Sequence, residues 1–433
     1  MKFVSDLNKF IEFRKTHLCH SMSISYDPEP LYISKAQGVT LYDQDGKPHL
    51  DCINNVSHIG HCNAYYIEKM TSQLNVLLTN SRFLYDPLHN VLEKLLRRFP
   101  PELCVVTFAN AGSEANDLAI QMARIHTGNH NIVCLDGAYH GHTDLCMQVS
   151  PYKWNENYKQ PTSTIIVDSP CTYRGKYRDQ PDQSSVLYAQ DYAKQLNGGK
   201  VAAFIAEPMQ SCAGQIIPYK DYFKEMIKVT KEHGGVFIAD EVQTGFARIG
   251  SHFWAFEHFG ILPDIVCVGK AMGNGFPVSA VITTKEVAAS YHKRGIEYFN
   301  TYGANPLACV AAEAVLDVIE QSDLQNNALV VGKYLTENLQ QFLQYDFVGD
   351  LRGQGLFQGI DIVQSKETRT PNPEVANRIK ALMRKESVLI STDGVHRNVI
   401  KFKPPIVFSK ENVDQLISAL KKVLKQVSEE VKV

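Results

Sequence analysis

The chain has 433 residues, 44 % of them hydrophobic, which is enough for two domains or for one large domain with a smaller lobe. Its formal net charge is −2 at pH 7 and it has no basic stripe or tail, which argues against nucleic acid and anionic membranes as partners. Ten cysteines without a CxxC pair fit reduced thiols. No apolar run reaches membrane-spanning length and no signal-peptide core is present, so we expect a cytoplasmic protein, with a mitochondrial location left open.

The predicted elements change in character along the chain. Up to about residue 55, polar turns separate short strands, and DQDGK at residues 43–47 indicates a hairpin. Between about residues 104 and 284, apolar strand-like runs alternate with helix-like runs, which predicts a mostly parallel sheet with helices on both faces. The strand candidates are CVVTFAN, NIVCLDG, STIIVDS, VAAFIAEP, GVFIADEV, DIVCVGK and VSAVITT.

After this region, PLACVAAEAVLDVIEQ from Pro306 predicts an amphipathic helix. A mixed lobe follows, and a closing helix begins at about Lys410. We therefore divide the chain into an N-terminal segment of the small lobe (1–55), a large domain (56–310) and a C-terminal small domain (311–433).

Polar side chains stand at the ends of several predicted strands. Gly112 and Ser113 lie where a strand meets a helix, and the free N–H groups of a helix start favour phosphate there, although serine is also a common helix cap. Tyr139 follows another strand and is able to stack on a flat ring, but taken alone it is better explained as a packed tyrosine in a loop.

Two acids and a lysine complete the pattern. Glu207 and Asp240 end apolar strands, and Asp240 either meets a cationic group or caps a helix. Lys270 follows a buried strand, where a lysine of lowered pKa is the usual amine for Schiff-base chemistry; the Walker spacing of a phosphate-binding lysine is absent. A single ligand with a phosphate, a flat ring, a basic ring nitrogen and an aldehyde accounts for all of these, and pyridoxal 5′-phosphate has all four.

The segments AGSEAND, YHG, AEP, DEVQTGF, GKAMGNG and NTYGANPLA, in this order, resemble the class III aminotransferase family of pyridoxal-phosphate enzymes. The resemblance covers about residues 38–408. It implies fold type I, an α/β fold with a large domain built on a mostly parallel seven-stranded sheet and a smaller α+β lobe formed by both termini. The segment 56–310 would then be the cofactor-binding domain.

The resemblance also implies a role for each site residue. Gly112 and Ser113 would bind the cofactor phosphate, and Tyr139 would stack on the ring. Asp240 would pair with the ring nitrogen. The remaining cofactor contacts would be Glu207, Gln243 near the ring oxygen O3′, Lys270 as the covalent attachment point, and Thr301. Because Thr301 would reach the phosphate bound by the neighbouring subunit, a homodimer with shared active sites is expected, and a tetramer is left open.

One position separates two possible reactions. Lys401 in VIKFKPP stands where transaminases of the family usually have an arginine for the keto-acid carboxylate, and lysine is a poorer bidentate partner. Segments such as TYRGKYR and STDGVHRNVIKFKPP instead resemble the phospho-lyase branch, which acts on ethanolamine phosphate and 5-phosphohydroxy-L-lysine. This resemblance implies that phosphate and ammonia are eliminated from a β-phosphorylated primary amine to give an aldehyde. The candidates for binding the substrate phosphate are Arg82, Arg174, Lys176, Arg178, Arg397 and Lys401, with solvated surface charge as an equal alternative for each.

Other positions depart from that branch. Pro208, Thr244 and Phe276 differ from what it leads us to expect, and Pro208 and Thr244 favour an ω-amino-acid or amine:keto-acid transaminase of the alanine–glyoxylate type. A non-catalytic binding protein on the same fold is a remote alternative, against which the presence of both Asp240 and Lys270 argues. The cluster SHIGHC at residues 57–62 is a poor zinc site, so no metal is expected.

Overall fold

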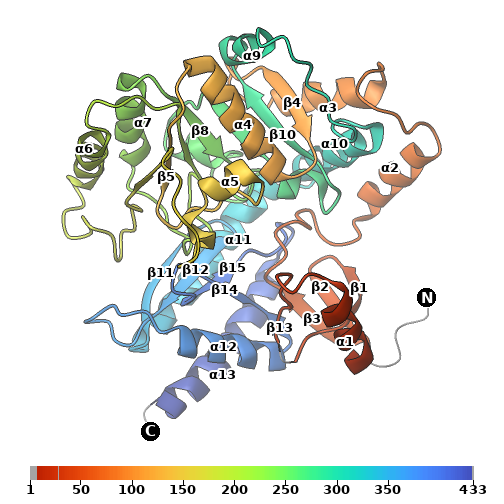
Figure 1. The fold of residues 1–433 in the computed structure, drawn as a ribbon. Helices are drawn as coiled ribbons and strands as arrows, with labels where there is room; N and C mark the ends of the chain where they lie inside the picture. Colours follow the sequence, from red (N-terminus) through yellow and green to blue (C-terminus); the bar gives the residue numbers. More distant parts are fainter. Residues whose placement is uncertain (1–6, 28, 432–433) are drawn as a thin grey trace.

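A seven-stranded sheet forms the centre of the large domain (Figure 1). The computed structural model describes residues 7–27 and 29–431. The strand order is β4-β10-β9-β8-β7-β5-β6, with β10 antiparallel to both neighbours and the other pairs parallel. The strands are β4 (Val105–Ala109), β5 (Ile132–Leu135), β6 (Thr164–Val167), β7 (Ala203–Ala206), β8 (Val236–Asp240), β9 (Ile265–Val268) and β10 (Ser279–Thr283). All seven predicted strands are present, so the predicted fold class is confirmed.

Helices cover both faces of this sheet because successive side chains of each buried strand point in opposite directions. On one face, Ile205 and Ile238 share a core with α4 (Gly112–Thr127) and α9 (Lys285–His292). On the other face, Phe204 and Phe237 belong to the core that includes helices from several parts of the chain. These helices are α3 (Asp86–Leu96), α6 (Ser184–Leu196), α7 (Tyr222–Glu232) and α10 (Pro306–Gln321).

The smaller lobe, below the large domain in Figure 1, is built from both ends of the chain. One sheet has the order β1-β2-β3-β13, and β3 pairs in parallel with β13 from the C-terminal part. The predicted hairpin is β2–β3, in which Asp43 Oδ1 accepts hydrogen bonds from the backbone N–H groups of Asp45 and Lys47. Its strands are β1 (Ile33–Gln37), β2 (Thr40–Asp43), β3 (Pro48–Asp51) and β13 (Val388–Leu389).

A second sheet of the lobe is antiparallel, in the order β11-β12-β15-β14. The expected domain boundary at residue 310 falls inside α10. The lobe's other elements are β11 (Val348–Gln354), β12 (Phe357–Ile362), β14 (Ser391–Asp393), β15 (Val399–Phe402), α11 (Leu324–Leu339), α12 (Pro373–Lys385) and α13 (Lys410–Val431). The remaining helices are α1 (Leu7–His17), α2 (Ala64–Leu74), α5 (Asp144–Gln148), α8 (Ala255–His258) and the 3-10 turns η1 (Pro151–Lys153), η2 (Lys270–Gly273) and η3 (Gln340–Gln344). In the described part, no helix is long and apolar enough to cross a membrane.

Candidate active site

One cavity of about 200 Å³ lies beyond the carboxyl ends of β5, β7, β8 and β9. Parallel strands present their carboxyl ends at one edge of the sheet, so the loops that follow them meet there. The cavity is lined by seven of the residues predicted from the sequence as cofactor contacts: Gly112, Ser113, Tyr139, Glu207, Asp240, Gln243 and Lys270. Residues far apart in the chain are thus brought together in the predicted site.

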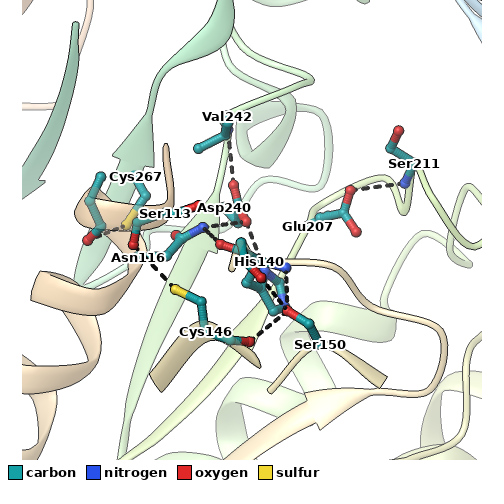
Figure 2. A network of polar contacts seen from close by, with 12 residues as sticks. Ser113, Asn116, His140, Cys146, Ser150, Glu207, Ser211, Asp240, Val242 and Cys267 are labelled. Carbon is teal, nitrogen blue, oxygen red and sulfur yellow. Dashed lines mark hydrogen bonds and ion pairs between the residues drawn. The ribbon is translucent and has the colours of Figure 1, made fainter. Parts of the chain in front are cut away.

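Asp240, the last residue of β8, is held from several directions (Figure 2). Its Oδ2 accepts hydrogen bonds from Asn116 Nδ2 at 2.8 Å and from His140 Nδ1 at 2.7 Å, and its Oδ1 accepts one from the Val242 N–H at 3.0 Å. Its side chain is 4 % exposed. A nearly buried carboxylate fixed in this way is held in one direction, which suits pairing with a cationic ring nitrogen.

Glu207 follows β7 and stands on another wall of the same cavity. Its Oε2 accepts a hydrogen bond from the Ser211 N–H at 3.0 Å, whereas its buried Oε1 has no partner among the described residues (Figure 2). Burial raises the pKa of Glu207 to about 7, and the charge of Asp240 contributes to this rise. A buried polar atom without a partner requires one to avoid a desolvation cost, and a polar ligand in the cavity would supply it.

One end of the cavity is formed by the start of α4. Ala111 at the N-cap makes no side-chain capping bond, so the first N–H groups of the helix remain available. Two glycines allow backbone segments around this end of the cavity to approach their neighbours closely. A Cβ on Gly112 would lie 2.6 Å from Val242 Cγ1, and a Cβ on Gly141, whose φ is +134°, would lie 2.4 Å from Ser113 Oγ.

Lys270 begins η2 just beyond β9. Its φ of +25° lies in the left-handed region, a strained conformation for lysine of the kind that concentrates at functional sites. The described residues offer its amine no hydrogen bond or ion pair, which leaves it free to react.

Gln243 is hydrogen-bonded to Ser211 and Asn55, two residues that were not predicted from the sequence as part of the site. Its Nε2 donates to Ser211 Oγ, and its Oε1 accepts from Asn55 Nδ2. Asn116 and His140 were also missed, although both lie inside stretches quoted for other residues. Their positions could have indicated them: Asn116 is the fifth residue of α4, whose start forms one end of the cavity, and His140 directly follows Tyr139, the predicted stacking residue.

Neither Thr301 nor any of the six basic candidates lines this cavity. Thr301 is exposed on the loop between α9 and α10. Arg82 is exposed and pairs with Glu297 at 3.0 Å. Arg178 pairs with the adjacent Asp179 at 3.4 Å.

The other basic candidates belong to the region between the large domain and the small lobe. Arg174 and Lys176 line a second cavity of about 340 Å³, where Arg174 bonds to Asp361 and Lys176 to Asp191. The two remaining candidates are on or next to β15: the exposed Arg397, and Lys401, whose Nζ donates to Asp393 Oδ2 at 2.6 Å.

The histidines near residue 60 support the fold. His58 is buried, with Nε2 2.6 Å from the Phe246 carbonyl and Nδ1 accepting from Arg248. His61 Nε2 lies 2.7 Å from Asp51 Oδ2. Within residues 7–27 and 29–431, no group of three or more His, Cys, Asp or Glu side chains is arranged to hold a metal ion.

The family model for class III aminotransferases matches residues 21–424 of the chain. The chain belongs to the class III aminotransferase family. An alanine–glyoxylate aminotransferase 2-like protein of Drosophila melanogaster is 45 % identical to this member over 97 % of the chain and 87 % of the relative. An ethanolamine-phosphate phospho-lyase homologue of Caenorhabditis elegans is 39 % identical over 98 % and 94 %. A solved phospholyase from Arthrobacter, in complex with phosphoethanolamine, superposes with a TM-score of 0.91 at 34 % identity, covering 96 % of this chain and 99 % of that one.

Class III aminotransferases use pyridoxal 5′-phosphate, and the cavity of this member fits that cofactor. The open start of α4 suits the phosphate, the fixed carboxylate of Asp240 suits the ring nitrogen, and the free amine of Lys270 suits the aldehyde. The unpartnered Glu207 Oε1 is a further polar group facing a ligand of this kind.

Proposed function

We propose that the protein is a phospho-lyase that eliminates phosphate and ammonia from a β-phosphorylated primary amine, with ethanolamine phosphate and 5-phosphohydroxy-L-lysine as the leading substrates. The net reaction consumes one water per amine and yields an aldehyde, ammonia and phosphate. No keto acid takes part, so such an enzyme needs a site for a leaving phosphate and no site for a keto-acid carboxylate.

The observation that carries this proposal is a cluster of two lysines and one acid next to the cofactor cavity. Lys401 and Lys403 approach Asp393 Oδ2 at 2.6 and 3.8 Å, so positive charge exceeds negative charge in this largely buried place whenever Lys403 is protonated. Burial lowers the pKa of Lys403 to about 7, and a bound anion would favour its protonated form. Lys403 also bonds to Ser211, which in turn contacts the cavity residue Gln243. An excess of buried cations favours an anionic ligand.

The type of cation supports phosphate over a keto acid. Lys401 has a side-chain exposure of 19 %, so its ammonium is accessible to a ligand. An ammonium is a compact charge that suits phosphate, whereas a keto-acid carboxylate is better held by the planar fork of an arginine. The phosphoethanolamine bound in the Arthrobacter phospholyase supports the same substrate class.

In this reaction Asp240 and Lys270, in the cavity, and Lys401, outside it, each have a definite role. When bound, pyridoxal phosphate supplies a ring that accepts the electron pair left as the carbon–hydrogen bond beside the amine breaks. Asp240 keeps the ring nitrogen protonated, which strengthens that effect. Lys270 Nζ accepts the proton from this carbon. The carbon–oxygen bond on the adjacent carbon then breaks with its electron pair leaving on phosphate, and Lys401 stabilises the departing charge.

We also propose that the active unit is a homodimer. Exposed apolar side chains gather on two loops that are joined by the Arg82–Glu297 ion pair at 3.0 Å. The exposed apolar residues on these loops and at the adjoining end of α2 are Leu74, Val76, Leu77, Leu78, Phe83, Leu84, Ile296, Tyr298, Phe299 and Tyr302. Patches of this kind are typical of protein–protein interfaces. Thr301 lies within the second loop, where a partner's cofactor phosphate would be in reach.

The second candidate is a transaminase. The 45 % identity to an alanine–glyoxylate aminotransferase 2-like protein favours it, as do Pro208 and Thr244. The two reactions differ in products and in the need for an acceptor, so one panel of substrates separates them.

The test is to measure phosphate and ammonia release from ethanolamine phosphate, 5-phosphohydroxy-L-lysine and unphosphorylated ethanolamine, alongside keto-acid transamination of each amine. A phospho-lyase releases phosphate and ammonia in equal amounts from a phosphorylated amine. Amino transfer to pyruvate or glyoxylate without phosphate release would overturn the proposal.

A further inference from the structure

Lys403 is a fully buried lysine that does not line the cofactor cavity. It directly follows β15, and its Nζ donates to Ser211 Oγ. Burial lowers the pKa of Lys403 to about 7, which reflects the cost of taking an ammonium out of water. A buried lysine outside the cavity can influence the cavity only through the residues that it contacts. Ser211 is the contact that connects Lys403 to the cavity residue Gln243.

Ser211 receives two donors. Lys403 Nζ and Gln243 Nε2 both donate to its Oγ, which uses both acceptor positions of the hydroxyl. While Lys403 is protonated, its ammonium has no acceptor, so Ser211 Oγ has to accept from it. The amide of Gln243 then has its nitrogen directed at Ser211 and its Oε1 at Asn55 Nδ2.

This arrangement determines which group Gln243 presents to the cavity. One N–H of its Nε2 is used by Ser211, and Oε1 is used by Asn55. The second N–H remains, and Gln243 lines the cavity. If the amide were flipped, Gln243 would offer a carbonyl oxygen where an N–H now stands.

We propose that Lys403 is a positioning residue for the cofactor: through Ser211 it holds Gln243 so that an amide N–H is available to the ring oxygen O3′. The inference rests on the assignment of Gln243 to the cofactor and is independent of the choice between lyase and transaminase. It gives Lys403 a task distinct from that of Lys401, whose ammonium is partly exposed and does not bond to Ser211.

Four other titratable groups act on Lys403. Lys401 and Lys270 lower its pKa, whereas Asp393 and Cys212 raise it. Asp393 keeps Lys401 as a partner at 2.6 Å when Lys403 is replaced, so removal of Lys403 leaves no orphaned acid. Lys403→Met removes the charge, keeps the length of the side chain and is expected to preserve or raise the melting temperature.

The experiment measures the visible absorbance of the resting holoenzyme against pH, with no amine present. An N–H bonded to the ionised ring oxygen favours the form that has lost its proton. Lys403→Met and Ser211→Ala, which each remove that support, are therefore expected to raise the pH midpoint by about 0.5–1 unit. Because both act through the same contact, the double variant is expected to shift no further than either single variant.

Lys380→Met is the matched control, because Lys380 is a partly buried lysine on α12 whose ammonium lies over the ring of Tyr26. Its midpoint is expected to equal that of the wild type. An unchanged midpoint in Lys403→Met or in Ser211→Ala would overturn the inference, as would additive shifts in the double variant. A lower melting temperature with no shift of the midpoint would show a structural role alone. Since no amine is added, the outcome does not depend on which reaction the enzyme catalyses.

Discussion

Asp240 and Glu241 are adjacent acids that point to different surroundings. Asp240 faces the cavity, while Glu241 turns into the core, where its Oε1 accepts from the Phe256 N–H at 2.7 Å and its Oε2 from the Thr244 hydroxyl at 2.8 Å. Neighbouring residues at a strand end face opposite sides. The sequence predicted Asp240 as a site residue. Nothing in the sequence indicated that the side chain of Glu241 connects the end of β8 to α8.

Replacing Asp240 with Asn tests the proposed electron-withdrawing role. The amide is nearly isosteric, but it cannot hold a protonated ring nitrogen by charge, and its nitrogen would meet the donors of Asn116 or His140. We expect cofactor to remain bound and turnover to fall about 100-fold or more, a loss of about 3 kcal/mol. Steady-state kinetics on the reconstituted variant measure this, and turnover within a few-fold of wild type would refute the assignment.

Glu241→Gln tests the buried acid through the pH dependence of stability. Burial raises the pKa of Glu241 from its ordinary value of 4.5 to about 7. A raised pKa means that the folded state binds the proton more tightly, so this stabilisation is complete below about pH 4.5 and is lost as the pH rises through 7. The loss is about 3 kcal/mol.

The wild type should therefore become less stable between about pH 5 and pH 7, as followed by urea unfolding. Glu207 has a similar pKa and contributes in the same window, so the Gln variant should keep roughly half of the slope. Lys403, whose pKa is lowered, contributes with the opposite sign above about pH 7, outside this range. Equal slopes in wild type and variant would be inconsistent with a buried proton on Glu241.

At the scale of elements, the strand–loop–helix order of the large domain could be predicted because each buried strand is a short apolar run bounded by polar or glycine residues. The site residues at the strand ends followed from the same pattern. The contact between Lys403 and Ser211, 192 residues apart, could not be predicted, because it depends on how the small lobe packs against the large domain. The pairing of β3 with β13 could not be predicted either, because it joins segments from opposite ends of the chain.

Gly141→Ala tests the close approach between the loop after β5 and the start of α4. The added Cβ would meet Ser113 Oγ at 2.4 Å, and the φ of +134° disfavours alanine. We expect the affinity for pyridoxal phosphate to fall at least about 10-fold, measured by fluorescence titration of the apoenzyme. Gly46→Ala is the control, since its φ of +80° imposes similar backbone strain in open space far from the cavity. Equal affinity in both variants would exclude a role for this contact.

At the scale of the whole molecule, one chain brings seven of the eight predicted cofactor contacts to one cavity but leaves the eighth, Thr301, exposed beside an apolar surface. Leu84 in this surface is fully exposed. Leu84→Asp should weaken the proposed dimer by placing a charge in its interface, and cofactor retention should fall with it. Sedimentation velocity at several concentrations measures the change. Val186→Asp on α6, an exposed apolar position outside this surface, is the control, and an active wild-type monomer would contradict the shared site.

The reaction itself is tested most directly by one measurement on the whole enzyme. Purified protein is incubated with an excess of ethanolamine phosphate or 5-phosphohydroxy-L-lysine and no keto acid, while phosphate, ammonia and the visible absorbance of the cofactor are followed together. The account predicts many turnovers, equal amounts of phosphate and ammonia, and a cofactor that stays in its aldehyde form. A reaction that stops after a single turnover with the cofactor converted to its amine form, and resumes on addition of pyruvate or 2-oxoglutarate, would contradict it.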